Sequence, residues 1–150
     1  MYSPGKILYF DPFYFKNGNT AKPKYFIVLH VDGGNTLLAS LPTRSDHVPS
    51  FLPIKHGCIN ADDANFNCYH FEAGKPITTN DFAFEMPTFV YGSQVDNYQL
   101  DLLKEIYQVE DVEYKVIGTL KKDEFVNLID CFLNSASVKR KFKAILSKSL

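Results

Sequence analysis

The sequence predicts a mainly β protein, a small barrel of five to seven short strands followed by two or three α-helices. Over most of the chain, apolar residues form strand-length runs separated by Gly, Pro and Asn turns. Towards the end, their spacing changes to the 3.6-residue period of helices. Thirteen Phe and nine Tyr, with no Trp, suit the pleated face of a sheet. We expect a single domain, with the barrel over about 4–120 and the C-terminal helices over about 121–149.

The strands are predicted from short apolar runs and from turn residues. The run at 25–31 is almost continuously apolar, which is typical of a buried central strand. The sequence Asp-Gly-Gly-Asn at 32–35 predicts a hairpin turn, because Gly supplies the positive φ that such turns require. Residues 36–41 then return beside the central strand, and 44–53, with two prolines, form a loop. The remaining candidate strands are 7–10, 56–60, 66–71, 82–84, 88–91 and 112–120.

Helices are predicted where apolar residues follow the i, i+3, i+4, i+7 rule. Leu100, Leu103 and Tyr107 indicate a helix over 98–108. A second, amphipathic helix is predicted over 122–134 and a third over 137–148, with Ser135 or Ser137 as its cap.

Composition places limits on location and partners. No apolar run approaches the roughly 18 residues of a membrane span, and no signal peptide is evident. Three cysteines are few and odd in number, which favours reduced thiols and a cytoplasmic location. We therefore expect no membrane partner.

Charge is unevenly distributed along the chain although its net value is −1. Residues 1–56 contain six Lys and Arg and three Asp and Glu. Residues 57–114 contain two basic and eleven acidic residues, and residues 115–150 contain eight basic and three acidic residues. A fold that joins the two basic ends would create a positive face suited to nucleic acid. The alternative is that these charges lie on separate solvated surfaces.

Two parts of the chain resemble the MazF/PemK-like toxin family. Residues 5–12, Gly-Lys-Ile-Leu-Tyr-Phe-Asp-Pro, resemble the family's opening, followed by a basic-Pro segment at 22–24 and a strand ending in Thr43. Near the end, Val-Ile-Gly-Thr-Leu at 116–120 precedes an amphipathic helix, as in that family. The similarity covers about residues 4–44 and 112–134. The middle of the chain and the final basic helix depart from the pattern.

The resemblance implies an SH3-like β-barrel that cleaves single-stranded RNA without a metal or other cofactor, acts as a homodimer and is neutralised by an antitoxin protein. In the family, an Arg beside a Pro at the start of the second strand and a Thr at the end of the third serve cleavage. Thr43 matches the second position, but Lys24, or Lys22 before Pro23, stands at the first. Lysine lacks the planar two-pronged fork of arginine. A non-catalytic SH3-like barrel that binds protein or nucleic acid is therefore the alternative.

Metal-independent RNA cleavage requires a base for the 2′-OH proton, an acid for the leaving oxygen and a cation for the charged phosphorane. Candidate catalytic residues lie near the adjoining ends of the second and third predicted strands: Lys24, Thr43, Arg44 and His47. Arg44 is the best cation, and histidine, which titrates at about pH 6.5, suits an acid or base. These residues would otherwise be ordinary strand-end and loop charges.

Other residues are candidates for RNA binding alone. Aromatic rings stack on bases, and cationic side chains neutralise phosphates. The candidates are Tyr9 or Phe10 for stacking, and Lys22, Lys139 and Arg140 for the backbone. The basic run at 139–143 would otherwise be the solvated face of a terminal helix.

A second constellation pairs a His and a Cys two residues apart, twice. His56 with Cys58, and Cys68 with His70, would each share one face of a strand. A hairpin that joined the four would form a Cys₂His₂ zinc site and make the protein a small zinc-stabilised binding module. The alternative, which we expect, is that both cysteines are small apolar residues and no metal binds. Cys131 falls on the apolar face of a predicted helix and is expected in the core.

Overall fold

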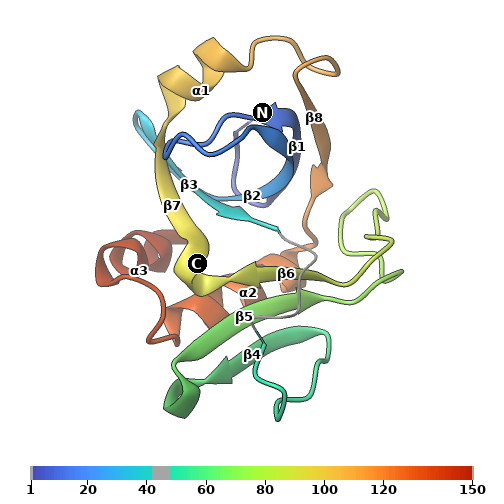
Figure 1. The fold of residues 1–150 in the computed structure, drawn as a ribbon, viewed down its shortest axis with the longest axis vertical. Coiled ribbons are helices and arrows are strands. Elements are labelled where there is room, and N and C mark those ends of the chain that lie inside the picture. The colour runs from blue at the N-terminus through green and yellow to red at the C-terminus, as the bar shows by residue number, and fades with distance from the viewer. Residues whose placement is uncertain (1, 42–47, 150) are drawn as a thin grey trace.

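A computed structural model describes residues 2–41 and 48–149 (Figure 1). Within these residues, eight strands form two antiparallel sheets, and three α-helices complete a mainly β fold. The strand pairing in this part of the chain joins neither sheet into a closed ring. None of the helices described is long and apolar enough to cross a membrane.

The larger sheet has five strands in the order β7-β3-β2-β1-β8. Its middle is made by consecutive strands β1 (Lys6–Phe13), β2 (Lys22–Asp32) and β3 (Asn35–Ser40). The predicted hairpin turn is confirmed, since Asp32 pairs with Asn35 and Gly33 has a φ of 57°. The edge strands, β7 (Val95–Gln99) and β8 (Tyr114–Thr119), arrive from the second half of the chain.

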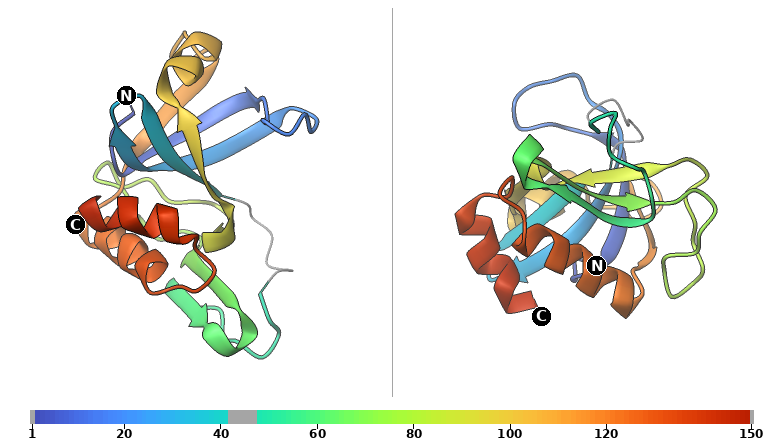
Figure 2. Two further views of the ribbon diagram at one scale, coloured as in Figure 1. Left: turned by 90° about the vertical axis from the view of Figure 1, so that its left-hand side faces the viewer. Right: turned by 90° about the horizontal axis from the view of Figure 1, so that it is seen from below.

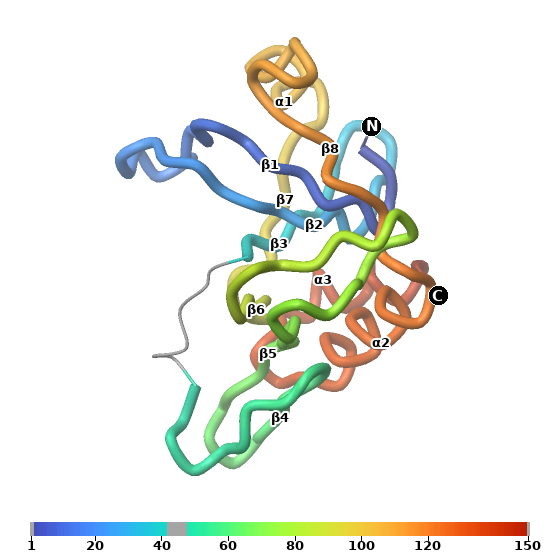
Figure 3. The backbone as a smooth tube through the Cα atoms, turned by 90° about the vertical axis from the view of Figure 1, so that its right-hand side faces the viewer, coloured from blue at the N-terminus to red at the C-terminus, as the bar shows by residue number. Residues whose placement is uncertain are grey.

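The smaller sheet contains β4 (Gly57–Ala61), β5 (Phe66–Phe71) and β6 (Thr88–Tyr91), in that order. It lies at the opposite end of the molecule from α1 (Leu100–Ile106), as Figure 3 shows. Of the two remaining helices, α2 (Lys122–Leu133) packs against β4 and β5 of the smaller sheet, and α3 (Arg140–Leu146) packs against α2 and β2 below the larger sheet (Figure 1).

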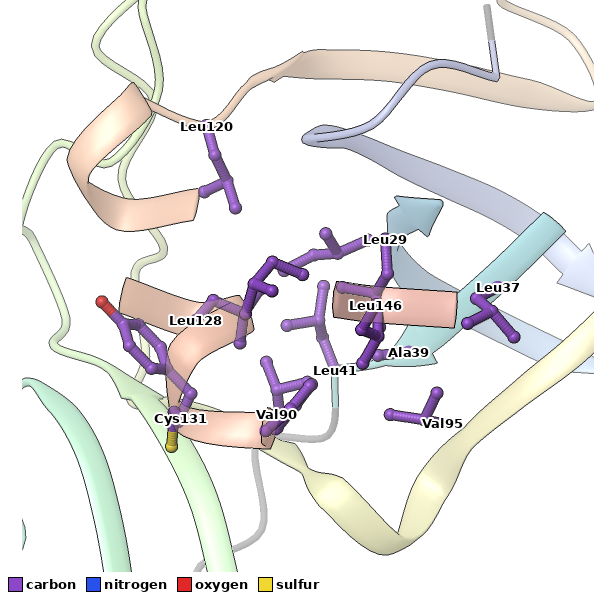
Figure 4. Packing of buried hydrophobic residues seen from close by; sticks show 14 of the residues in the cluster. Leu29, Leu37, Ala39, Leu41, Val90, Val95, Leu120, Leu128, Cys131 and Leu146 are labelled. Carbon is purple, nitrogen blue, oxygen red and sulfur yellow. The ribbon is translucent and has the colours of Figure 1, made fainter. Parts of the chain in front are cut away.

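The main core lies between the two sheets and the two C-terminal helices. Leu29 of β2, Val90 of β6 and Leu128 of α2 meet there with Leu146 of α3 (Figure 4). The opposite face of the larger sheet has its own core, in which Phe26 and Val28 pack with residues of α1. Alternate residues of β2 thus enter different cores, which explains the continuous apolar run of this strand.

One predicted strand is absent, and the predicted starts of two helices are wrong. Residues 82–84 form no strand, because their backbone carbonyls bond to the loop that precedes them and not to another strand. The N–H of Gly74 donates to the carbonyl of Phe84, and the N–H of Ile77 donates to that of Phe82. Residues 98 and 99 end β7 instead of starting a helix, and α3 begins only at Arg140. The other predicted strands and the helix at 122–134 are confirmed to within a few residues.

Candidate nucleic-acid interface

A groove of about 580 Å³ opens at the end of the larger sheet where β2 begins and β3 ends. Its walls come from the loop between β1 and β2, the first residues of β2, the end of β3, and β7. The lining residues are Phe15, Asn17, Asn19, Thr20, Lys22, Lys24, Phe26, Ser40, Gln94, Asp96 and Tyr98. This surface combines cations, amides, hydroxyls and aromatic rings.

The cations of the groove come from alternate positions of β2. Lys22, Lys24 and Phe26 share one face of the strand because side chains alternate across a sheet. Phe26 is buried in the core beneath, whereas Lys22 is exposed and Lys24 half-buried. The core therefore fixes the strand that presents both ammonium groups to the groove.

Aromatic rings and cations interleave along the groove. The Lys22 ammonium lies 5.9 Å from the ring centre of Phe15, and Lys16 lies 4.3 Å from that of Tyr98. Lys16 also forms an ion pair of 2.9 Å with Asp96, which is the only carboxylate among the lining residues that the structure describes. The groove thus carries lysine ammonium groups beside flat rings, the two kinds of group that a single strand of nucleic acid uses.

The end of β3 forms the opposite wall. The Ser40 hydroxyl donates to Oε1 of Gln94 over 3.0 Å, which ties β3 to the short 3₁₀ turn at Gly92–Gln94. Thr43 and Arg44 follow Ser40 in the sequence by three and four residues, and His47 by seven. These three predicted catalytic residues lie outside the described residues, so the structure places only Lys24 of the four.

The predicted stacking residues Tyr9 and Phe10 do not line the groove. Phe10 is wholly buried, with 0% of its surface exposed, among the rings of the α1-side core. Tyr9 packs on Tyr25 with ring centres 4.6 Å apart, on the sheet face opposite to Lys24. Phe10 is therefore too buried to stack on a base, which makes that expectation wrong, whereas Tyr9 stays a prediction for the opposite face; the rings that line the groove are those of Phe15 and Tyr98.

Lys139 and Arg140 also lie away from the groove. Arg140 begins α3, Lys139 occupies its N-cap position without a side-chain capping bond, and both are exposed. Figure 2 shows α3 and the loop between β1 and β2 on opposite sides of the molecule. The basic segments near the two ends of the chain therefore do not merge into one positive face at this groove.

The four zinc candidates do not converge. Cys58 pairs with Tyr69 and Cys68 with Ile59, so the two cysteines lie on opposite faces of the β4–β5 hairpin. Cys58 forms a disulfide with Cys131, which corrects both the expected reduced state and the assignment of Cys131 to the core alone. Cys68 is a buried free thiol. No group of three or more His, Cys, Asp or Glu suited to a metal occurs within residues 2–41 and 48–149.

His56 takes part in a different cluster, which the sequence did not indicate. Its Nε2 lies 2.8 Å from Oε2 of Glu124 on α2, and the Tyr69 hydroxyl donates to Oε1 over 2.6 Å. Because the backbone N–H of Glu72 donates to Nδ1 of His56, Nε2 carries the proton that faces Glu124. Burial, followed by the hydrogen bond and charge of Glu124, raises the pKa of Tyr69. The carboxylate thus joins β5 and the start of β4 to α2.

His70 is engaged on the other face of the hairpin. Its Nδ1 lies 2.9 Å from the Lys55 carbonyl, and its ring stacks on Phe89 at 4.8 Å. These contacts hold a side chain that is buried, with 5% of its surface exposed.

Comparison with known proteins leaves the groove as the main guide to function, because no protein-family model matches the chain and no curated protein matches it.

Proposed function

We propose that this protein binds single-stranded RNA in the groove at the start of β2. The observation that carries the proposal is the joint presence of Lys22 and Lys24 with the rings of Phe15 and Tyr98 along one groove. Ammonium groups that follow a phosphate backbone and rings that stack on bases are the recurrent means of holding a single strand. The resemblance to MazF/PemK-like toxins favours RNA over DNA.

We further propose that the groove cleaves the RNA it binds, as a metal-independent endoribonuclease of the toxin type. In this mechanism a base removes the 2′-OH proton, the 2′ oxygen attacks the adjacent phosphorus, and an acid protonates the departing 5′ oxygen. Arg44 would stabilise the charged phosphorane and His47 would exchange the protons. The curved larger sheet fits an SH3-like barrel, and a homodimer with an antitoxin in the cytoplasm completes the toxin proposal.

A non-catalytic RNA-binding protein is the second candidate, and the residue that favours it is Lys24. Lysine neutralises a phosphate as a point charge but cannot hold it with two parallel hydrogen bonds. The two candidates share the groove and differ in whether the bound RNA is cut.

RNA binding predicts that Lys22→Ala and Lys24→Ala each weaken affinity for a fluorescent single-stranded RNA of about 20 nucleotides. Each change should also reduce the slope of log affinity against log salt by about 0.7, because one phosphate contact is lost. Lys75→Ala is the matched control, since Lys75 is exposed and does not line the groove. Unchanged affinity in both groove variants, with loss in Lys139→Ala or Arg140→Ala, would place the interface on α3.

Cleavage predicts that the wild-type protein cuts RNA in the presence of EDTA and that Arg44→Ala cuts it about a hundredfold more slowly. The reason is that removing a preorganised charge stabiliser costs about 3 kcal/mol in the transition state. Lys24→Arg should raise the rate if the lysine is a weakened form of the family's arginine. RNA that binds but stays intact with every form of the protein would decide for the non-catalytic candidate.

A further inference from the structure

The Cys58–Cys131 disulfide lies at the surface, where it borders a cavity of about 340 Å³ between β4 and α2. Its two sulfur atoms differ in environment. Cys58 lies on an edge strand and is exposed, whereas Cys131 is only 4% exposed, within the packed face of α2. A small molecule entering the cavity therefore meets the Cys58 end of the bridge first.

We propose that this cavity is a site of thiol–disulfide exchange, in which a small neutral or cationic thiol modifies Cys58. The incoming thiolate forms a new S–S bond with Sγ of Cys58. The Cys58–Cys131 bond breaks, and its electron pair stays on Sγ of Cys131, which then takes up a proton. A second thiolate attacking the external sulfur of the adduct would release a small disulfide and leave both cysteines as thiols.

The leaving sulfur has a hydrogen-bond donor already in place. Nδ2 of Asn67 lies 3.3 Å from Sγ of Cys131 and 3.4 Å from its carbonyl oxygen. Asn67 is 3% exposed, so its amide is held by the surrounding core. A donor directed at a developing thiolate stabilises it, and a more stable leaving thiolate departs faster.

The third cysteine cannot compete for the modification. Cys68 is buried on the opposite face of the hairpin, and burial raises the pKa of its thiol to about 12. It stays protonated and out of reach of the cavity, so the adduct is confined to Cys58.

The charges around the cavity select among thiols. Asp123 and Asp130 are exposed on the α2 wall, and Lys75 is the one lysine among the described residues that line the cavity. The Glu124 carboxylate accepts a hydrogen bond from Nε2 of His56. The cavity is therefore negative, and it repels a thiol that carries a carboxylate and attracts one that carries an ammonium group.

The test treats the purified oxidised chain with 2-aminoethanethiol or 3-mercaptopropionate at equal thiolate concentration. Iodoacetamide stops the reaction, and peptide mass spectrometry locates the products. We expect the thiol adduct on Cys58, iodoacetamide on Cys131 and neither on Cys68. The reference is the rate of 2-aminoethanethiol divided by that of 3-mercaptopropionate in their reaction with bis(2-hydroxyethyl) disulfide. With the protein this rate ratio should be about threefold higher, and in high salt it should fall to the reference value because salt screens the charges of the cavity.

Two variants separate the selectivity from the chemistry. Asp130→Asn, a change at an exposed position, should lower the preference for the cationic thiol, whereas Asp62→Asn outside the cavity should not. Asn67→Ala should slow the release of Cys131 with both thiols equally. The proposal is overturned by three free thiols in the untreated protein, by an intact bridge that no thiol opens, by an adduct on Cys131 or Cys68, or by a rate ratio equal to that of the small disulfide.

Discussion

Replacing Glu124 with alanine is expected to lower the free energy of unfolding by about 2–5 kcal/mol. The carboxylate accepts hydrogen bonds from the Tyr69 hydroxyl at 2.6 Å and from His56 Nε2 at 2.8 Å, and only 6% of its surface is exposed. Its removal leaves the buried Tyr69 hydroxyl and the half-buried His56 N–H without a partner, and an unsatisfied buried donor costs about 1–3 kcal/mol. Urea unfolding followed by circular dichroism measures the change.

The control for Glu124→Ala lies one turn further along the same helix. Asn127 is exposed, so Asn127→Ala should change the unfolding free energy by less than about 0.5 kcal/mol. Tyr69→Phe removes one of the two donors, and its effect should shrink when Glu124 is already alanine, because the interaction is then gone. Equal stability of Glu124→Ala and the wild type would show that the hydrogen bonds of Glu124 with His56 and Tyr69 do not stabilise the packing of the smaller sheet against α2.

The strands could be predicted because local patterns determine most of them. The residues at 32–35 specify a hairpin whose geometry depends on its own glycine, and the run at 25–31 marks a strand covered on both faces. The prediction of a strand at 82–84 was wrong because Phe82 and Phe84 pack against the main core without pairing with another strand. Burial of aromatic side chains alone therefore does not identify a strand.

The groove could be predicted only in part. The family resemblance of the basic-Pro segment pointed to Lys22 and Lys24, but the stacking residue depended on the register between β1 and β2. Lys24 pairs with Phe10, so Tyr9 belongs to the opposite face. Tyr98 enters the groove through the pairing of β3 with β7, which joins segments about 60 residues apart. Such long-range pairing has no local signature in the sequence.

The cysteines show the same limit. The spacing of Cys68 with His70 correctly placed that pair on one face of β5, whereas His56 lies just before β4 and outside the strand of Cys58. Hairpin register then put Cys58 and Cys68 on opposite faces, and the packing of α2 against β4 brought Cys131 to Cys58. The partner of a cysteine is thus decided by docking of distant elements and not by its neighbours in sequence.

Removal of the Cys58–Cys131 bridge is expected to lower the free energy of unfolding by about 4 kcal/mol. The two residues are 73 apart in the sequence, so the bridge closes a long loop and restricts the unfolded chain strongly. Urea unfolding with and without dithiothreitol measures the effect. The wild type should shift to lower urea on reduction, whereas Cys58→Ala/Cys131→Ala should start at the reduced midpoint and stay there.

A matched variant distinguishes loss of the bridge from any other effect of the reductant. Cys68→Ala removes the remaining thiol and leaves the bridge, so it should respond to dithiothreitol as the wild type does. The contacts beside the bridge do not involve its sulfur atoms: His56 meets Glu124, and the Asn60 side chain donates to the Asn134 carbonyl. The reduced protein should therefore remain folded in the absence of urea. An unchanged urea midpoint after complete reduction would mean that these contacts, and not the covalent bond, hold β4 to α2.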